Sequence, residues 1–101
     1  MLVPNTMAQG AVSRHQLRIT PLELRRVLWV HHCEEGSLGW HVNGPYYFGG
    51  LGWRPATWLR FRAPWMPLVM SGATIREQAW AMVRFANTFG WPDLNGACYA
   101  Y

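Results

Sequence analysis

The chain has no lysine, few acidic residues and no long apolar run. Its 101 residues include nine basic positions, all of them arginine, and five acidic ones, for a net charge of +4. No apolar run approaches the ~20 residues of a membrane-spanning helix, so no membrane span is expected. The arginines form no basic cluster, so nucleic acid is not an expected partner. Two explanations of the charge stay open: arginine-biased codon use, and attraction to a polyanionic partner.

The sequence also lacks metal ligands at the spacing of a metal-binding motif. His31, His32 and Cys33 set three possible ligands side by side, but adjacent ligands rarely share one zinc ion, and no CxxC or HxxxH motif accompanies them. We therefore expect no metal and no cofactor. Cys33 and Cys98 are the only cysteines and permit one bridge, which would indicate an oxidising compartment. Residues 1–18 lack the form of a signal peptide, so either a signal was removed or export follows another route.

The length allows one small domain, and the sequence signals make it mainly α. Residues 1–19 are polar and aperiodic, and we expect them to form an arm or linker before a domain over 20–101. Residues 37–54 are rich in glycine and aromatic residues and predict a loop or a short irregular hairpin. A short helix is expected from Pro55, and a last helix from Thr74, where a second capping box begins.

The first helix has the clearest boundaries. Thr-Pro-Leu-Glu at residues 20–23 combines an N-cap, a proline at the first helical position and a capping box. Gly36 can end the helix in the left-handed conformation, which places Glu34 and Glu35 in the last turn. Four residues recur at helical spacing on one face: Leu24, Val27, Leu28 and His31.

The two glutamates are candidates for acid chemistry. The C-terminus of a helix carries partial negative charge, which disfavours an ionised carboxylate. A neighbouring glutamate disfavours it further, and packing by tryptophan would add desolvation. All three effects raise the pKa of Glu34, as a general acid near neutral pH requires. The alternative is that Glu34 and Glu35 are two solvated surface acids.

The glycine-rich segment offers a second set of candidates. Gly49 and Gly50 follow three aromatic residues, and a turn without side chains lets backbone amides approach a ligand. The alternative is an ordinary hairpin turn. Trp40, Trp53 and Trp58 can stack on sugar rings, or can belong to the core, as most tryptophans of a small domain do.

These features follow one another in the order known from one family. The matching elements are Cys33-Glu34, Trp40, Tyr46-Tyr47, Gly49-Gly50-Leu51, Thr57-Trp58, Arg76-Glu77-Gln78, Gly90-Trp91-Pro92 and Cys98. The run resembles the resuscitation-promoting factor and transglycosylase-like domain of actinobacteria, a compact lysozyme-like α+β domain that acts on peptidoglycan. The resemblance covers about residues 21–98.

The resemblance implies a role for each matching element. Glu34 would be the catalytic acid, Cys33 and Cys98 would form a disulfide, and the Gly49-Gly50-Leu51 turn would line the glycan groove. The expected substrate-binding residues, from the resemblance and the aromatic pattern together, are Trp40, Tyr46, Tyr47, Gly49, Gly50, Leu51, Trp53, Thr57 and Trp58. The chain departs from the family at Gly52, where a glutamine is usual, and at Phe48, which separates the tyrosines from the glycines.

The number and positions of the acidic residues limit which type of glycan cleavage the chain could catalyse. Glycoside hydrolases normally place two carboxylates on opposite sides of the scissile bond. No acid lies between Glu35 and Glu77; Glu77 is explained by its capping box, and Asp93 lies in a tail turn. A single acid fits a lytic transglycosylase, in which Glu34 protonates the glycosidic oxygen of the MurNAc-GlcNAc β-1,4 bond and a hydroxyl of the muramic residue closes an anhydro ring. A helper role for Glu35, which would allow hydrolysis, stays open.

A non-catalytic function is the main alternative. A wall-binding or virion structural module on the same lysozyme-like fold would keep the groove without the reaction. In both cases the expected partner is the glycan strand of peptidoglycan, with virion or cell-wall proteins as possible partners of the N-terminal arm. The expected location is the cell wall after secretion, or a virion if a phage encodes the chain.

Overall fold

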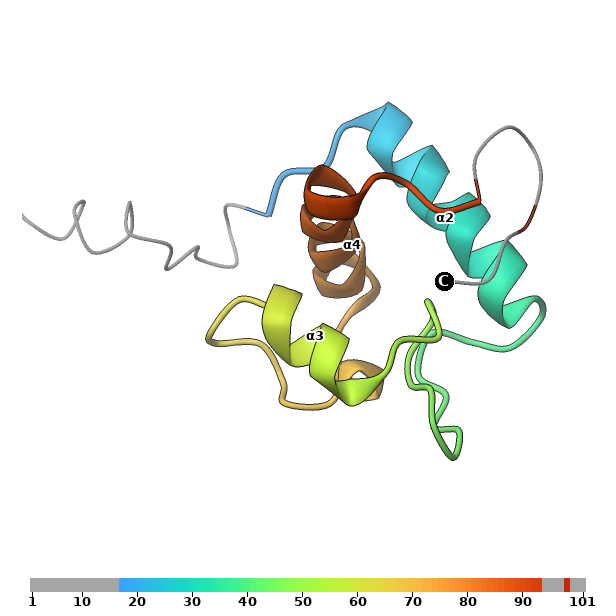
Figure 1. The fold of residues 1–101 in the computed structure, drawn as a ribbon, viewed down its shortest axis with the longest axis vertical. Helices are drawn as coiled ribbons and strands as arrows, with labels where there is room; N and C mark the ends of the chain where they lie inside the picture. The colour runs from blue at the N-terminus through green and yellow to red at the C-terminus, as the bar shows by residue number, and fades with distance from the viewer. Residues whose placement is uncertain (1–16, 94–97, 99–101) are drawn as a thin grey trace, which may run out of the picture.

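The structure is a computed structural model that describes residues 17–93 and 98. Its ordered elements are α2 (Pro21–Glu35), α3 (Pro55–Phe61), the 3-10 turn η2 (Met70–Gly72) and α4 (Ile75–Phe89). Helix α4 packs against both α2 and α3, and the chain after α4 runs back toward α2 (Figure 1). The domain is therefore small and mostly helical, as expected. Of the arm that was expected over residues 1–19, residues 1–16 lie outside the described residues.

Both expected capping boxes are present, and they fix where the long helices begin. The Glu23 amide donates to Thr20 Oγ1 at 3.1 Å, and the Thr20 amide donates to Glu23 Oε1 at 2.8 Å. Thr74 and Glu77 repeat this exchange at the start of α4, at 3.1 and 2.7 Å. Each box satisfies amides that the first helical turn leaves without partners.

The helices also end at the expected glycines. Gly36 follows α2 with φ 59° and ψ −120°, and Gly90 follows α4 with φ 89° and ψ 161°. Both conformations have positive φ, which a side chain disfavours. The chain can therefore turn sharply after Glu35, and the last turn of α2 ends beside a loop.

The segment between α2 and α3 is a short irregular hairpin. Phe48 and Trp53 exchange two backbone hydrogen bonds, at 2.9 and 3.1 Å, across the four residues 49–52. Phe48 also forms an antiparallel bridge with Asn43. Among residues 17–93 these isolated bridges are the only strand-like pairing. Phe48, which has no counterpart in the family pattern, is thus the central residue of the hairpin.

The core lies between α4, α3 and the hairpin. Trp53 and Trp58 are 2% and 1% exposed, and the Phe85 ring of α4 lies 5.4 Å from both the Trp53 and the Phe61 rings. Leu17 is buried as well, and its carbonyl accepts a hydrogen bond from Arg76 at 2.8 Å. Packing therefore includes residues before position 20, the expected start of the domain.

The residues that recur at helical spacing in α2 do not mark its buried face. Leu24 and Leu28 are 40% and 45% exposed, whereas Val27 and Val30 are completely buried. Helix α2 carries apolar residues around its whole circumference, so its sequence alone does not define which side meets α4. The buried stripe is the one that leads along the helix from Val27 and Val30 toward Glu34.

Candidate functional site

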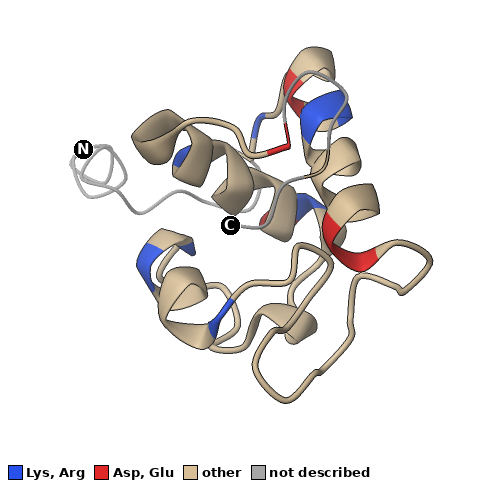
Figure 2. Ribbon diagram, turned by 45° about the vertical axis from the view of Figure 1, so that its right-hand side comes forward, with Lys and Arg blue, Asp and Glu red and all other residues tan. Residues whose placement is uncertain are grey.

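The site is centred on the last turn of α2. Glu34 and Glu35 are both partly buried and occupy the final two positions of the helix. Figure 2 shows this acidic turn at the end of α2, next to the coil of the hairpin region. The helix thus ends with two carboxyl groups at the junction of three segments: α2, the hairpin and the chain that follows α4.

Glu34 is the most perturbed acid of this site. The pKa of Glu34 is raised to about 7: burial contributes most, followed by a hydrogen bond with Asp93 and by the negative charges of Asp93 and Glu35. The upward direction and the effect of Glu35 agree with expectation, but the contribution of Asp93 was missed. A carboxyl group with a pKa near 7 is protonated in a substantial fraction of molecules at neutral pH, so it can donate a proton.

Asp93 joins the site from far along the chain. Its side chain is 2% exposed and its φ is 57°, a left-handed conformation that aspartate tolerates better than most residues. It lies just after Pro92, in the segment that returns from α4 to α2. Its position in a tail turn of the sequence concealed this role. The pairing of Cys98 with Cys33, the neighbour of Glu34, was the signal that could have revealed it.

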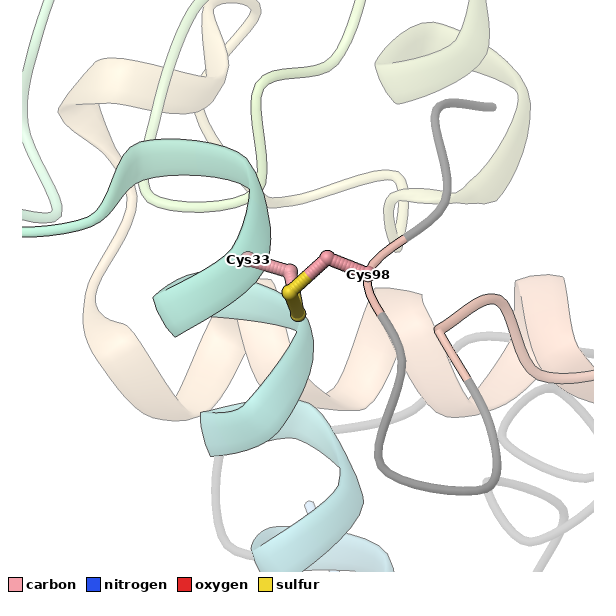
Figure 3. The surroundings of a disulfide bond; sticks show 2 residues. All are labelled: Cys33 and Cys98. Atoms are coloured by element: carbon pink, nitrogen blue, oxygen red, sulfur yellow. A yellow bond between two sulfur atoms is a disulfide. The ribbon is translucent and has the colours of Figure 1, made fainter.

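The disulfide between Cys33 and Cys98 is confirmed. The two sulfur atoms are bonded at 2.04 Å, and the Cα atoms are 5.2 Å apart (Figure 3). The bridge joins the residue immediately before Glu34 to the segment that carries Asp93. It therefore ties together the two parts of the chain from which the carboxyl pair is built.

Glu35 lies in a different setting from Glu34. Burial raises its pKa, and the charge of His31, one turn earlier on α2, opposes that rise. His31 is held in place by its ring: Nδ1 donates to the Gly50 carbonyl at 2.6 Å, and the ring stacks on Trp40 at 4.2 Å between centroids. The expected sugar-binding Trp40 thus lies partly buried on His31.

The glycine turn does not present its amides to a ligand, which corrects the expectation. The Gly49 amide donates to the Val42 carbonyl at 2.9 Å, and the Gly50 amide donates to Gln78 Oε1 at 2.8 Å. A Cβ at Gly49 would lie 2.6 Å from Met70 Cγ, and one at Gly50 would collide with the Trp40 ring. These glycines are required for close packing inside the protein.

Gln78 is the buried polar side chain that holds the turn. It is completely buried on α4; its Oε1 accepts from Gly50, and its Nε2 donates to the carbonyls of Trp40 and Ala73 at 2.8 and 3.1 Å. All three partners are backbone groups, so one side chain satisfies three segments at once. In the sequence, Gln78 was only part of a matching tripeptide.

Gly52 lies against both acids and also lines a neighbouring cavity. Its φ is 63°, and a Cβ there would lie 2.9 Å from Glu35 Oε2 and 3.7 Å from the Glu34 Cβ. The positive φ disfavours a larger residue, and the nearest atom belongs to the flexible end of Glu35. A glutamine, which the family pattern has at this position, would therefore be strained here and would displace the Glu35 carboxyl group.

A cavity of about 250 Å³ lies beside Gly52. Its lining residues come from the hairpin, α3 and α4: Tyr47, Gly52, Trp53, Arg54, Thr57 and Phe85. The Arg54 guanidinium lies 5.7 Å from the centre of the Tyr47 ring. Among the expected substrate-binding residues, Tyr47, Trp53 and Thr57 thus line one cavity. Trp53 is 2% exposed and belongs to the core, so the accessible part of the wall combines the Tyr47 ring with a cation and a hydroxyl.

The other expected binding residues lie elsewhere. Trp58 is 1% exposed, and its indole Nε1 donates to the Pro67 carbonyl at 2.8 Å, so the ring has no surface on which a sugar could stack. Leu51 is completely buried. Tyr46 is 71% exposed at the tip of the hairpin and does not line the cavity. Trp58 and Leu51 are therefore core residues, which is the alternative that the sequence left open for tryptophan.

The described residues contain no group of three or more potential metal ligands, and no helix among them is long and apolar enough to cross a membrane. Comparison of the chain with protein-family models, with curated proteins and with solved structures finds no match. The case for a function therefore depends on the geometry of the site.

Proposed function

We propose that the chain is a lysozyme-like domain, related to the resuscitation-promoting factor and transglycosylase-like family, that cleaves peptidoglycan as a lytic transglycosylase. Glu34 is its general acid and base. The observation that supports this most is the position of Glu34 at the end of α2, beside Gly52 and the cavity, with a pKa of about 7. An acid that must both give and take a proton works best when its pKa is near the working pH.

The position of Asp93 supports the single-acid mechanism. Asp93 is hydrogen-bonded to Glu34, so the two carboxyl groups are in contact. In hydrolases the two carboxyl groups stand about 5–9.5 Å apart, with the sugar ring between them. A contacting pair leaves no room for a sugar, so Asp93 does not serve as the second carboxylate. Glu34 is then the acid that reacts with the glycan.

The reaction needs only one proton carrier. The protonated carboxyl of Glu34 gives its proton to the glycosidic oxygen as the bond from that oxygen to the anomeric carbon of the muramic residue breaks. A hydroxyl of the same muramic residue then attacks that carbon and closes the anhydro ring. The hydroxyl proton passes to the Glu34 carboxylate, which restores the acid. No water is consumed, so the two products together have the mass of the substrate.

The cavity suits contact with a polymer rather than enclosure of a small ligand. Its volume of about 250 Å³ lies below the ~300–1,000 Å³ of pockets that bury drug-sized molecules. A glycan strand would lie across it, with Tyr47 and Thr57 against a sugar and Arg54 near the acidic groups of the wall polymer. The disulfide supports an oxidising location, at the cell wall or in a virion.

The test is digestion of purified peptidoglycan, with the products identified by mass. We expect the wild type to release anhydro-muropeptides, each one water lighter than the product of hydrolysis. Glu34→Gln removes the proton and should lower the rate by roughly 10²–10⁴-fold. Glu35→Gln is the matched control, because it changes the neighbouring carboxyl in the same way and should keep most of the activity.

Three outcomes would contradict the proposal in different ways. Products with reducing ends would indicate a hydrolase. An equal loss of activity in Glu35→Gln would mean that both glutamates take part in the chemistry. Binding of peptidoglycan by the folded wild type without any release of products would favour the alternative, a non-catalytic wall-binding or virion structural module.

A further inference from the structure

We propose that the cavity beside Gly52 is a carboxylate-binding subsite, in which Arg54 and Thr57 select glycan strands that carry a free carboxylate close to the bond to be cleaved. The inference rests on the proposed function for the identity of the ligand, and it adds Arg54 as a specificity-determining residue. Arg54 is not among the residues that match the family pattern, so the resemblance assigns it no role.

The Arg54 guanidinium is available for a ligand. It lies 5.7 Å from the centre of the Tyr47 ring, and within residues 17–93 no carboxylate pairs with it. The side chain is exposed and forms part of the cavity wall. An arginine that stacks on an aromatic ring is restrained in orientation, while its N–H groups still point away from the ring plane's centre and can donate. The cavity thus presents an oriented cation without a counter-charge.

Thr57 supplies a hydroxyl to the same cavity. It lies in the first turn of α3, three residues after Arg54, and its amide donates to the Arg54 carbonyl at 3.1 Å. The hydroxyl itself has no hydrogen-bond partner among the described residues. A guanidinium and a hydroxyl are both donors that a carboxylate accepts, and the guanidinium can make two parallel hydrogen bonds with it. The polar groups of the wall therefore match a single carboxylate.

The position of Gly52 connects this cavity to the acids. A Cβ at Gly52 would lie 2.9 Å from Glu35 Oε2 and 3.7 Å from the Glu34 Cβ, and Gly52 also lines the cavity. A strand in contact with Glu34 therefore passes the cavity. The muramic residue of such a strand carries a carboxyl group on its lactyl ether, and a stem peptide attached there carries further carboxyl groups. Both sources offer the same chemistry to Arg54.

Two other arginines, in α3 and directly after it, show what distinguishes Arg54. Arg62 is engaged by the fold, since its Nη1 donates to three backbone carbonyls of residues 63–66. Arg60 resembles Arg54 more closely: it is exposed and lies over two phenylalanine rings, 5.1 and 5.0 Å from their centres. Arg60 does not line the cavity. It is therefore a matched control, because its loss removes the same charge from another place.

The experiment measures binding without cleavage, by NMR titration of the full oxidised chain carrying Glu34→Gln. One probe is the peptide-free tetrasaccharide of alternating GlcNAc and MurNAc, with free lactyl carboxylates. The other is the same tetrasaccharide with these groups converted to uncharged methyl amides. We expect the free acid to bind about tenfold more tightly, as a charge-assisted hydrogen bond at a partly solvated site allows.

The variants assign this preference to a residue. Arg54→Gln should abolish it, Arg54→Lys should retain part of it, and Arg60→Gln should leave it unchanged. Thr57→Val should reduce it less than Arg54→Gln does, because it removes a neutral donor. Both arginines are exposed, so both glutamine variants are expected to fold.

A third probe separates the two sources of carboxylate. It is the tetrasaccharide with the dipeptide L-Ala-D-Glu on each lactyl group, so that the lactyl carboxyl is an amide and the charges lie on the peptide. Tight binding that depends on Arg54 would assign the subsite to the stem peptide. Binding as weak as that of the methyl amide would assign it to the lactyl carboxylate.

Equal affinities for the free acid and the methyl amide would overturn the proposal, and so would an equal loss of preference in Arg54→Gln and Arg60→Gln. The proposed function fails separately. A carboxylate preference that depends on Arg54, in a wild type that releases no product from peptidoglycan, would refute the transglycosylase and leave the subsite standing. Release of anhydro-muropeptides at the same kcat/KM by the wild type and Arg54→Gln would do the reverse.

Discussion

Helices α2 and α4 begin in the same way and serve different purposes. Both are 15 residues long, and both start with a threonine whose capping box includes a glutamate three residues on. Their buried surfaces differ. In the described chain α4 buries six residues, whereas α2 buries two, Val27 and Val30. The same local start thus leads to one helix in the core and one at its edge.

Polar residues of the two helices also differ in burial: Gln78 of α4 lies deeper in the protein than Glu34 and Glu35 of α2. On α4, Gln78 is completely buried and hydrogen-bonds to backbone groups of other segments, so its role is structural. On α2, Glu34 and Glu35 are only partly buried and have raised pKa values. Helix α4 supports the structure, and α2 carries the two carboxyl groups of the candidate site. The helix with the smaller apolar contact is the one that is fixed by a disulfide.

The largest expected effect comes from removing that disulfide. The bridge closes a sequence separation of 65 residues, and the chain-entropy model gives it about 4 kcal/mol of stability. The double variant Cys33→Ser/Cys98→Ser should therefore lower the free energy of unfolding by about that amount in urea titration. Because Cys33 lies on α2 and α4 carries neither cysteine, hydrogen exchange should increase in the last turn of α2 much more than in α4.

The same double variant also tests whether the disulfide holds the candidate site in place. If the bridge keeps Glu34 partly buried, the pKa of Glu34 in the folded double variant should lie below that of the wild type, because burial is the largest cause of its rise. An even loss of amide protection over both helices would contradict the division between a structural α4 and an α2 that is tied covalently.

Truncation of one side chain on each helix gives the next largest effect. Met82 of α4 is completely buried, and Met82→Ala should cost about 3 kcal/mol through lost contacts and a cavity. Leu28 of α2 is 45% exposed, and Leu28→Ala should cost less than about 1 kcal/mol. Urea unfolding of the two variants under one condition measures the difference. Equal losses would mean that α2 contributes to the core as much as α4 does.

The sequence predicted the ends of the helices because those signals are local. A threonine cap, a glutamate three positions later and a terminal glycine act within one turn, so they need no tertiary partner. Gly36 and Gly90 were placed correctly on these grounds. The face that α2 buries is not local: Leu24 and Leu28 are as apolar as Val27 and Val30, and only the position of α4 decides between them.

The candidate site was predictable only in part, for the same reason. The raised pKa of Glu34 was expected from its place in the helix and from Glu35. The contribution of Asp93 requires a contact between two distant segments, which no local pattern encodes. Gly49 and Gly50 were identified as important, but for ligand approach; their function is close packing against Met70 and Trp40. A glycine signals lack of space without showing what fills it.

The smallest expected effect is a pH dependence of stability that arises on α2 and not on α4. The folded pKa of Glu34 is about 7, above the ordinary 4.5 that we take for the unfolded chain. Below pH 4.5 both states hold the proton. Between 4.5 and 7 unfolding releases it, so the free energy of unfolding contributed by this group falls as the pH rises; above 7 the loss is complete.

Comparison of the wild type with Glu34→Gln isolates this group, because glutamine does not titrate. The wild type should lose stability relative to Glu34→Gln between pH 4.5 and 7, with no further relative change above pH 7, in urea midpoints measured along the series. Glu35→Gln should give the same sign, since burial raises the pKa of Glu35 as well. The effect is small because solvent reaches both groups and screens them. A wild type that gained stability relative to Glu34→Gln over this range would mean that Glu34 is ionised and paired with a cation in the folded protein, which would remove the basis for its role as an acid.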